Sequence, residues 1–397
     1  MKQILTGLLM LFMALTARAN DGVYFVNGNH LVPVQETDIS VTKEILTIDI
    51  CDDGFARVDV YYELTNDGRQ KTVDMGFEAS LPYNSGDNYD AKGRHPYIFD
   101  FAATMNGERL TYKTGVVKAS SQQEPTTFKT IDTKRWHVGN QEEWDMGNTS
   151  LVDNQGNELP IAYAYFFRAT FKPGRNIVHH TYSYQMSYGV YRAFEIPYWL
   201  TPATRWANHQ IDDFTLRIKA TDTAKHFYVP VSVFGSTPFK VVEGTGKVRR
   251  VKTQELGTVC EVSLRNGVVE WHRRNFQPKE NVVFTSADLL ITFDERRDIG
   301  SFYDRGRFFP QYKVDFKTFY GRAAKNSAEE KELICRILRN LPYAQRGYVF
   351  TDARMKRYFE SQWWYMPDAS WQMSTADFTP HDWEVINELS SPEAIPE

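Results

Sequence analysis

The chain has 397 residues, of which 46 are Lys or Arg, 50 are Asp or Glu, and 42% are hydrophobic. This composition excludes a disordered, a collagen-like and a coiled-coil protein. The formal net charge of -4 argues against tight binding of nucleic acid, which needs a basic surface to neutralise phosphates.

The N-terminal residues 1–19 have the pattern of a secretory signal peptide. The positively charged Lys2 precedes a largely apolar run at residues 4–15. The small residues Ala17 and Ala19 occupy the two positions that signal peptidase recognises before its cleavage site. This run is too short for the ~30 Å hydrocarbon core of a membrane, and no later segment reaches the roughly eighteen apolar residues that a spanning helix needs. We therefore expect an exported protein, periplasmic or extracellular, that is soluble after cleavage and has no transmembrane segment.

Residues 20–295 show the period-two alternation of β-strands, most clearly in residues 55–64 (FARVDVYYEL). Short segments typical of hairpin turns occur in this region, at positions 52–54, 106–107, 172–175, 244–246 and 266–267. Strands do not alternate with helices, which argues against a Rossmann or barrel fold. The pattern predicts an antiparallel β-sandwich, or two in tandem with a boundary near residue 190.

Two stretches depart from this alternation. Residues 114–160 are polar and carry Trp136 and Trp144 in hydrophilic surroundings. Loops of this length are commonly functional, so both tryptophans are candidate binding residues, and an irregular flap packed onto the sandwich is the alternative. Residues 296–326 mix charges and aromatics without a clear period, and we interpret them as a linker or junction.

A helical period begins at residue 327. Ser327 and Glu330 fit a capping box, Asp352 fits the N-cap of a second helix, and Thr379 fits that of a third, whereas Pro342 should stop or kink the first. We expect a small α-helical domain at residues 327–391, followed by a tail at residues 392–397. The fold class is therefore mainly β, followed by a small C-terminal helical domain.

This last unit resembles the YARHG domain, a small domain of exported bacterial proteins. The resemblance covers Leu338 to Asn340, the peptide YAQRGYVF at residues 343–350, then Asp352, Tyr358, Phe359, the peptide WYMP at residues 364–367, and the closing residues 379–389. Gln345 stands where the family has Arg, and Arg346 stands where it has His. The resemblance implies a periplasmic or extracellular setting and contact with the cell envelope, and it implies no activity.

A weaker resemblance concerns the preceding region. Residues 191–200, Trp206 and residues 213–218 are similar to uncharacterised secreted β-rich domains that accompany YARHG units. This likeness implies no chemistry.

Within the helical unit, five residues are candidate binding residues: Tyr343, Arg346, Trp363, Tyr365 and Trp371. Trp363, Tyr365 and Trp371 would form a platform for a sugar or a peptide. The alternative is that the rings form the core of the unit, because so small a domain cannot leave many large rings exposed.

Three cysteines, Cys51, Cys260 and Cys335, allow at most one internal disulfide. Two interpretations stay open: all three are buried small hydrophobic residues, or Cys51 and Cys260 form a bridge. Cys260 would also face His272 across the turn at residues 266–267. That pair is the one candidate for nucleophilic catalysis, and proximity by chance is the alternative.

No motif for a catalytic, metal or cofactor site is present. The sequence lacks HExxH, Cys-x-x-Cys, an EF-hand loop, a P-loop and G-x-S-x-G. His179 and His180 are adjacent in a strand and therefore point to opposite faces, which disfavours joint binding of a metal. We accordingly predict no catalytic residues, no metal and no cofactor.

Together these features favour an exported, non-enzymatic cell-envelope protein with a binding or structural role. Its partner would be a cell-wall glycan or another envelope protein. The alternative is a secreted hydrolase that acts on glycan or peptidoglycan, which the 14% aromatic content and the polar stretch with Trp136 and Trp144 would suit.

Overall fold

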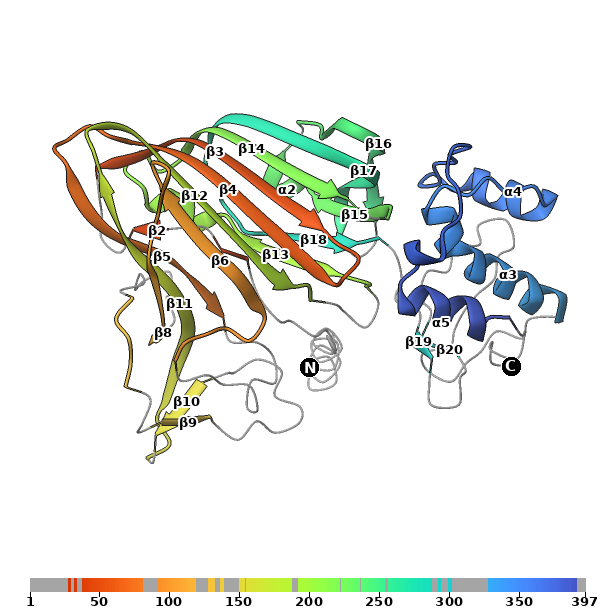
Figure 1. Ribbon diagram of the computed structural model, residues 1–397, viewed down its shortest axis with the longest axis horizontal. Coiled ribbons are helices and arrows are strands. Elements are labelled where there is room, and N and C mark those ends of the chain that lie inside the picture. The colour runs from red at the N-terminus through yellow and green to blue at the C-terminus, as the bar shows by residue number, and fades with distance from the viewer. Residues whose placement is uncertain are drawn as a thin grey trace, which may run out of the picture.

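The computed structural model describes the following residues of the chain (Figure 1): 28–29, 32–33, 38–80, 92–118, 128–132, 136–138, 150–153, 155–187, 192–221, 223–235, 237–253, 256–287, 292–293, 299–301 and 328–390. The expected signal peptide, Trp144, nearly all of the expected linker and the C-terminal tail lie outside these residues. Those that are described form a β-sheet region followed by a small helical unit, as the sequence predicts.

Most strands of the described residues belong to one sheet of twelve strands. In spatial order they are β1 (Gly28–Asn29), β13 (Glu195–Trp199), β18 (Val282–Ser286), β15 (Lys225–Pro230), β17 (Gly257–Phe276), β14 (Ile211–Ala220), β3 (Ile39–Ile50), β4 (Phe55–Asn66), β12 (Gly174–Gln185), β6 (Ile98–Met105) and β7 (Glu108–Arg109), with β16 (Lys240–Thr253) paired along β17. Neighbours are antiparallel except for β1 with β13 and β14 with β3.

A second sheet of six strands covers part of the first. Its strands are β2 (Val32–Pro33), β5 (Lys71–Ser80), β11 (Glu158–Phe171), β10 (Ser150–Asp153) and β9 (Trp136–Val138), with β8 (Tyr112–Lys118) paired to β11. A separate ribbon of two strands is formed by β19 (Thr292–Phe293) and β20 (Ile299–Ser301). Two short helical turns, η3 (Thr201–Arg205) and α2 (Val231–Phe234), follow β13 and β15.

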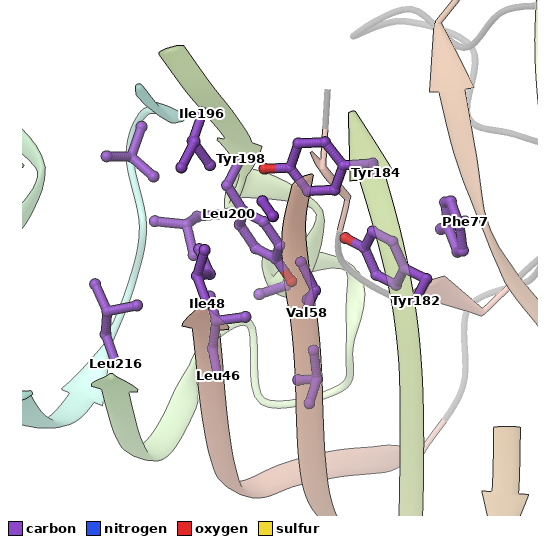
Figure 2. Packing of buried hydrophobic residues seen from close by; sticks show 14 of the residues in the cluster. Leu46, Ile48, Val58, Phe77, Tyr182, Tyr184, Ile196, Tyr198, Leu200 and Leu216 are labelled. Atoms are coloured by element: carbon purple, nitrogen blue, oxygen red, sulfur yellow. The ribbon is translucent and has the colours of Figure 1, made fainter. Parts of the chain in front are cut away.

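The layers enclose one large continuous core. Figure 2 shows Ile48 of β3 and Val58 of β4 beside Tyr198 of β13, and Tyr182 of β12 near Phe77 of β5. The rings of Phe77 and Tyr182 stack at 5.3 Å between centroids. Buried residues on both sides of residue 190 belong to this one cluster, so residue 190 does not divide the core. The alternation of strand side chains thus produces a sandwich in which one face of each sheet is withdrawn from water.

Two of the turns expected from the sequence are hairpins. Residues 52–54 join β3 to β4, which pair antiparallel, and residues 106–107 join β6 to β7. Asn106 and Gly107 have φ of 52° and 88°, as a tight two-residue hairpin requires. The hairpin expected at residues 172–175 is wrong, because β11 lies in the smaller sheet and β12 in the larger one. That turn carries the chain from one sheet to the other.

The hairpins expected at residues 244–246 and 266–267 are also wrong. Both segments lie inside long strands, β16 and β17, that pair with each other along their length. Asn266 and Gly244 have φ of 45° and 70°, and the pairing register shifts between Val241 and Thr245. Residues with positive φ form a β-bulge here instead of a turn. On the other edge of β17, its partner changes from β15 to β14 across this bulge.

The bulge separates the one pair that the sequence offered for nucleophilic catalysis. Cys260 pairs with Val229 of β15, and His272 pairs with Thr215 of β14 much farther along the same strand. The two residues therefore do not face each other across a hairpin. Burial also raises the pKa of the Cys260 thiol to about 11, which keeps it protonated at neutral pH.

All three cysteines are buried and none of them forms a disulfide, so the interpretation as small hydrophobic residues is confirmed and Cys51 and Cys260 form no bridge. Cys51 and Cys260 lie in the β region, whereas Cys335 belongs to the core of the helical unit.

The helical unit contains α3 (Ala328–Gln345), α4 (Ala353–Ser361), η5 (Thr375–Asp377) and α5 (Pro380–Glu388). Asp352 caps α4 and Thr379 forms a capping box with Asp382 at α5, as expected. Pro342 neither ends α3 nor prevents its last turn, since the helix continues to Gln345. Ser327, the expected cap of α3, lies outside the described residues. Within the described part of the chain, no helix combines the length and apolar character needed to cross a bilayer.

Candidate functional site

The seven candidate binding residues do not converge on one place. Trp136 lies in β9, in the smaller sheet, and Trp144 lies outside the described residues. The other five all belong to the helical unit, where they divide between its core, an exposed surface and the contact with the β region.

Arg346 stabilises the helical unit from within. Its guanidinium donates from Nη1 to the Pro342 carbonyl (2.8 Å), from Nε to the Asp377 carbonyl (2.9 Å) and from Nη2 to the Asp382 carboxylate (2.7 Å). It also lies over the ring of Phe378 at 4.3 Å, and the residue is 5% exposed. One side chain thus joins the end of α3 to the start of α5, and its donors are used inside the fold.

Tyr343 and Tyr365 also pack inside the unit. The half-buried ring of Tyr343 lies 5.0 Å from that of Phe378. Tyr365 is buried and its hydroxyl donates to the carbonyl of Tyr348. These two rings therefore belong mainly to the core, the alternative that the sequence left open.

Trp371 lies beside the exposed Tyr348, with the two rings perpendicular at 6.2 Å between centroids. Val349 and Met373, neighbours of these two along the chain, are also exposed. We call these four residues, Tyr348, Val349, Trp371 and Met373, the Tyr348–Trp371 surface. Of the residues expected to bind a ligand, only Trp371 belongs to it.

Trp363 lies where the helical unit meets the β region. The guanidinium of Arg249, on β16, sits 4.4 Å above its indole ring, which is a favourable cation–π geometry. The ring of His226, on β15, lies 6.0 Å from the same indole. The two parts of the chain meet beside β15, β16 and β17 (Figure 1). We call residues 363–368, which carry the helical unit's side of this contact, the docking segment.

Four successive carbonyl groups of the docking segment accept hydrogen bonds from side chains of the β region. Lys247 Nζ donates to the carbonyls of residues 363 and 365, at 3.0 and 2.9 Å. Ser263 Oγ donates to that of residue 364 at 3.0 Å, and Arg265 Nη1 donates to that of residue 366 at 2.7 Å. Partial burial at this contact lowers the pKa of Lys247. The β region thus recognises mainly the backbone of the segment.

Arg265 is almost completely enclosed at the contact. Its side chain is 8% exposed and forms an ion pair with Asp368 at 3.3 Å. A Cβ added to Gly347 would lie 1.8 Å from Arg265 Nη1, so the arginine occupies the space that any other residue would fill. Gly347 has φ of 93° and lies two positions after the end of α3, where a left-handed residue closes a helix. The glycine of the motif therefore both ends a helix and admits Arg265.

A second charged network lies beneath Trp363. His226 Nε2 and Glu261 Oε1 are 2.9 Å apart, and Arg249 Nε donates to Glu261 Oε2 at 2.6 Å. His226 and Glu261 are buried. Because a buried carboxylate is costly without partners, this network fixes Arg249 in the position where it meets Trp363.

The sequence did not single out Lys247, Arg249, Ser263 or Arg265. Their side chains converge because Lys247 pairs with Ser263, and Arg249 with Glu261, across β16 and β17. The basic residues at alternate positions 247 and 249 were the available signal, but the expected hairpin at residues 266–267 concealed the pairing. Among the residues that the structure describes, no group of three His, Cys, Asp or Glu side chains could hold a metal ion.

Comparisons with known proteins identify one part of the chain. Residues 317–394 match the model of the YARHG domain, as the sequence resemblance implied. No curated protein matches the chain.

Among solved structures, a candidate nutrient-binding protein from Legionella pneumophila is similar over 94% of this chain and 100% of its own, with 18% identity and a TM-score of 0.49. An M1 zinc metallopeptidase from Deinococcus radiodurans matches 60% of this chain and 43% of its own, with 11% identity and a TM-score of 0.24. A candidate protease from Parabacteroides distasonis matches 77% of this chain and 47% of its own, with 13% identity and a TM-score of 0.21. Because these scores lie below 0.5, we base no functional conclusion on them.

Proposed function

We propose that this chain is an exported, non-enzymatic protein of the cell envelope that binds a cell-wall glycan through its YARHG domain. The observation that carries the proposal is the Tyr348–Trp371 surface. The other candidate rings of the domain are packed in its core or covered by the β region, whereas Tyr348 is 38% exposed and Trp371 is half-buried beside it. An aromatic face with a polar edge is what binds the apolar face of a sugar.

The composition of this surface supports a binding role over a packing role. Val349 and Met373 are 43% and 54% exposed, so each of the two rings has an exposed apolar side chain within two positions along the chain. Exposed groups of this kind mark interaction sites more often than scattered single residues do. The resemblance to a domain of exported proteins supports the cell wall as the partner.

A cell-wall pull-down tests this proposal. The full chain should sediment with purified peptidoglycan, and Trp371→Ala and Tyr348→Ala should each reduce the bound fraction severalfold. Phe99→Ala is the matched control, because Phe99 is an exposed ring in the β region, 43% exposed. Undiminished sedimentation of both variants would contradict the proposal, and binding to a protein component of the envelope alone would replace the glycan by that partner.

Export is part of the same proposal. Mass measurement of the protein recovered from the producing cell should give a chain that begins at Asn20, after removal of residues 1–19. The hydrolase alternative depended on the polar stretch with Trp136 and Trp144, and it stays a prediction, since Trp144 and the side chain of Trp136 lie outside what the structure describes.

A further inference from the structure

The side chains that hold the docking segment form an ordered array on one face of the β16–β17 ribbon. Lys247 lies opposite Ser263, and Arg249 lies opposite Glu261, two positions farther along both strands. Arg265 follows Ser263 by two positions in the other direction, so all these side chains share one face. The pairing of β16 with β17 therefore holds these hydrogen-bond donors in position whether or not a ligand is bound.

The order of this array matches the order of the docking segment. Arg249 meets the ring of Trp363, Lys247 and Ser263 meet the carbonyls of residues 363–365, and Arg265 meets the carbonyl of residue 366 and the carboxylate of Asp368. The segment thus runs along the ribbon, with an aromatic anchor at one end and an acidic anchor at the other. Between these anchors only backbone carbonyls are bound by the array.

We propose that this face of β16 and β17 is a peptide-binding site, and that the chain's own docking segment is its resident ligand. The class of ligand is a short peptide without regular secondary structure that carries an aromatic ring and, five residues later, a carboxylate. Since the contacts between the anchors are to backbone atoms, a separate peptide of this pattern satisfies the same donors. The helical domain is then released when such a peptide replaces its docking segment.

This site shares no residue with the Tyr348–Trp371 surface, and it does not depend on the proposed glycan binding. The resident segment is tethered, and tethering gives it an effective concentration on the order of millimolar, so a free peptide binds the wild-type chain weakly. A variant whose own segment is weakened is therefore needed to measure the site.

The experiment uses the full chain with Asp368→Arg, which reverses the acidic anchor opposite Arg265. The probe is a labelled synthetic peptide with the wild-type residues 361–370 (SQWWYMPDAS), followed by fluorescence anisotropy. We expect this variant to bind the peptide at least about tenfold more tightly than the wild-type chain does, because its own segment no longer competes. Peptides in which Trp363 is replaced by Ala, or Asp368 by Arg, should lose this binding.

Two further variants make the assignment specific. Arg249→Ala added to Asp368→Arg should abolish peptide binding, whereas Arg250→Ala should not, because residue 250 faces the opposite side of β16. The double variant Arg265→Asp with Asp368→Arg restores the ion pair in reverse and should again exclude the wild-type peptide.

Hydrogen exchange of residues 363–368 reports docking in each chain, and circular dichroism reports folding. A folded Asp368→Arg chain that is undocked and binds no peptide would overturn the proposal. An Asp368→Arg chain whose segment stays docked would overturn the role of Asp368 as an anchor. Equal loss of peptide binding when Arg249→Ala or Arg250→Ala is added would overturn the role of this face. Failure of glycan binding changes none of these outcomes.

Discussion

At the scale of single residues, Arg346 shows what the sequence reveals and what it conceals. Its place in a motif marked it as a candidate binding residue. In the fold its donors reach Pro342, Asp377 and Asp382. Position in a motif indicates that a residue matters, but only the fold shows whether it binds an external ligand or its own backbone.

Replacing Arg346 tests this structural role. We expect Arg346→Met to lower the free energy of unfolding of the helical domain by about 2–4 kcal/mol, because it leaves Asp382 and two carbonyls without their buried donor. Urea denaturation followed by circular dichroism measures this loss. Arg354→Met is the control: its side chain is 61% exposed, and we expect a change below about 0.5 kcal/mol. Equal effects of the two substitutions would contradict the role given to Arg346.

Asp352 offers a second test, through pH. Its carboxylate caps α4, and the hydrogen bond from the Met355 N–H is the main cause that lowers the pKa of Asp352 from 3.8. A carboxyl whose pKa is lower in the folded state stabilises the fold above its unfolded pKa, and the benefit is lost as pH falls through the folded value.

Asp352→Asn keeps the capping oxygen but removes the charge. The stability advantage of the wild type over this variant should therefore be largest near neutral pH and shrink as the pH falls below 3.8. Thermal unfolding of both proteins at several pH values measures the difference. A difference that stays constant across this range would show that the charge of Asp352 does not contribute.

At the scale of elements, alternation predicted the strands well, and capping residues predicted α4 and α5. The turns were less predictable, because a residue pair such as Asn266–Gly267 supplies positive φ equally well to a hairpin and to a bulge. The structure uses the bulge here because Gly244 stands opposite on β16. A Cβ on Gly244 would lie 1.9 Å from the Asn266 carbonyl oxygen. Such a pairing of two distant glycine-containing segments cannot be read from either segment alone.

The bulge can be tested with two glycines of similar conformation. Gly244 and Gly257 have φ of 70° and 67°, but nothing lies within 4 Å of a Cβ added to Gly257. Gly257→Ala should therefore cost only the strain of a left-handed residue, about 1 kcal/mol. Gly244→Ala should cost clearly more, since β16 must move away from β17. Chemical denaturation of both variants measures the difference, and equal losses would argue against close contact at the bulge.

At the scale of the whole molecule, the sequence predicted a β-sandwich followed by a helical domain, but not the contact between them. The residues that form this contact are far apart in sequence: Ser263 and Trp364 are separated by 101 positions. No local sequence pattern predicts a contact between residues so far apart. What the motif did indicate was the glycine at 347, whose missing side chain leaves room for Arg265.

Docking should couple the unfolding of the two domains. Arg265→Met removes the donor to residue 366 and the ion pair with Asp368, and we expect it to lower the unfolding temperature of the helical domain by several degrees, as about 1–2 kcal/mol does in small domains. The transition of the β region should move less. Calorimetry measures both transitions, with the exposed Arg274→Met on the same strand as control. Identical scans for the two variants would show that docking does not stabilise the helical domain.

The parallel pairing of β3 with β14 has a consequence for the folding rate. These neighbours at the centre of the larger sheet come from distant parts of the chain, as the hydrogen bond from Val41 to Asn208 across 167 positions shows. Such a long-range pairing loses the conformational entropy of a large loop before its stabilising contacts form. This slows folding towards milliseconds to seconds or longer. Until β14 is available, β3 has only β4 as a partner, so the pairing at the centre of the larger sheet is completed late in folding.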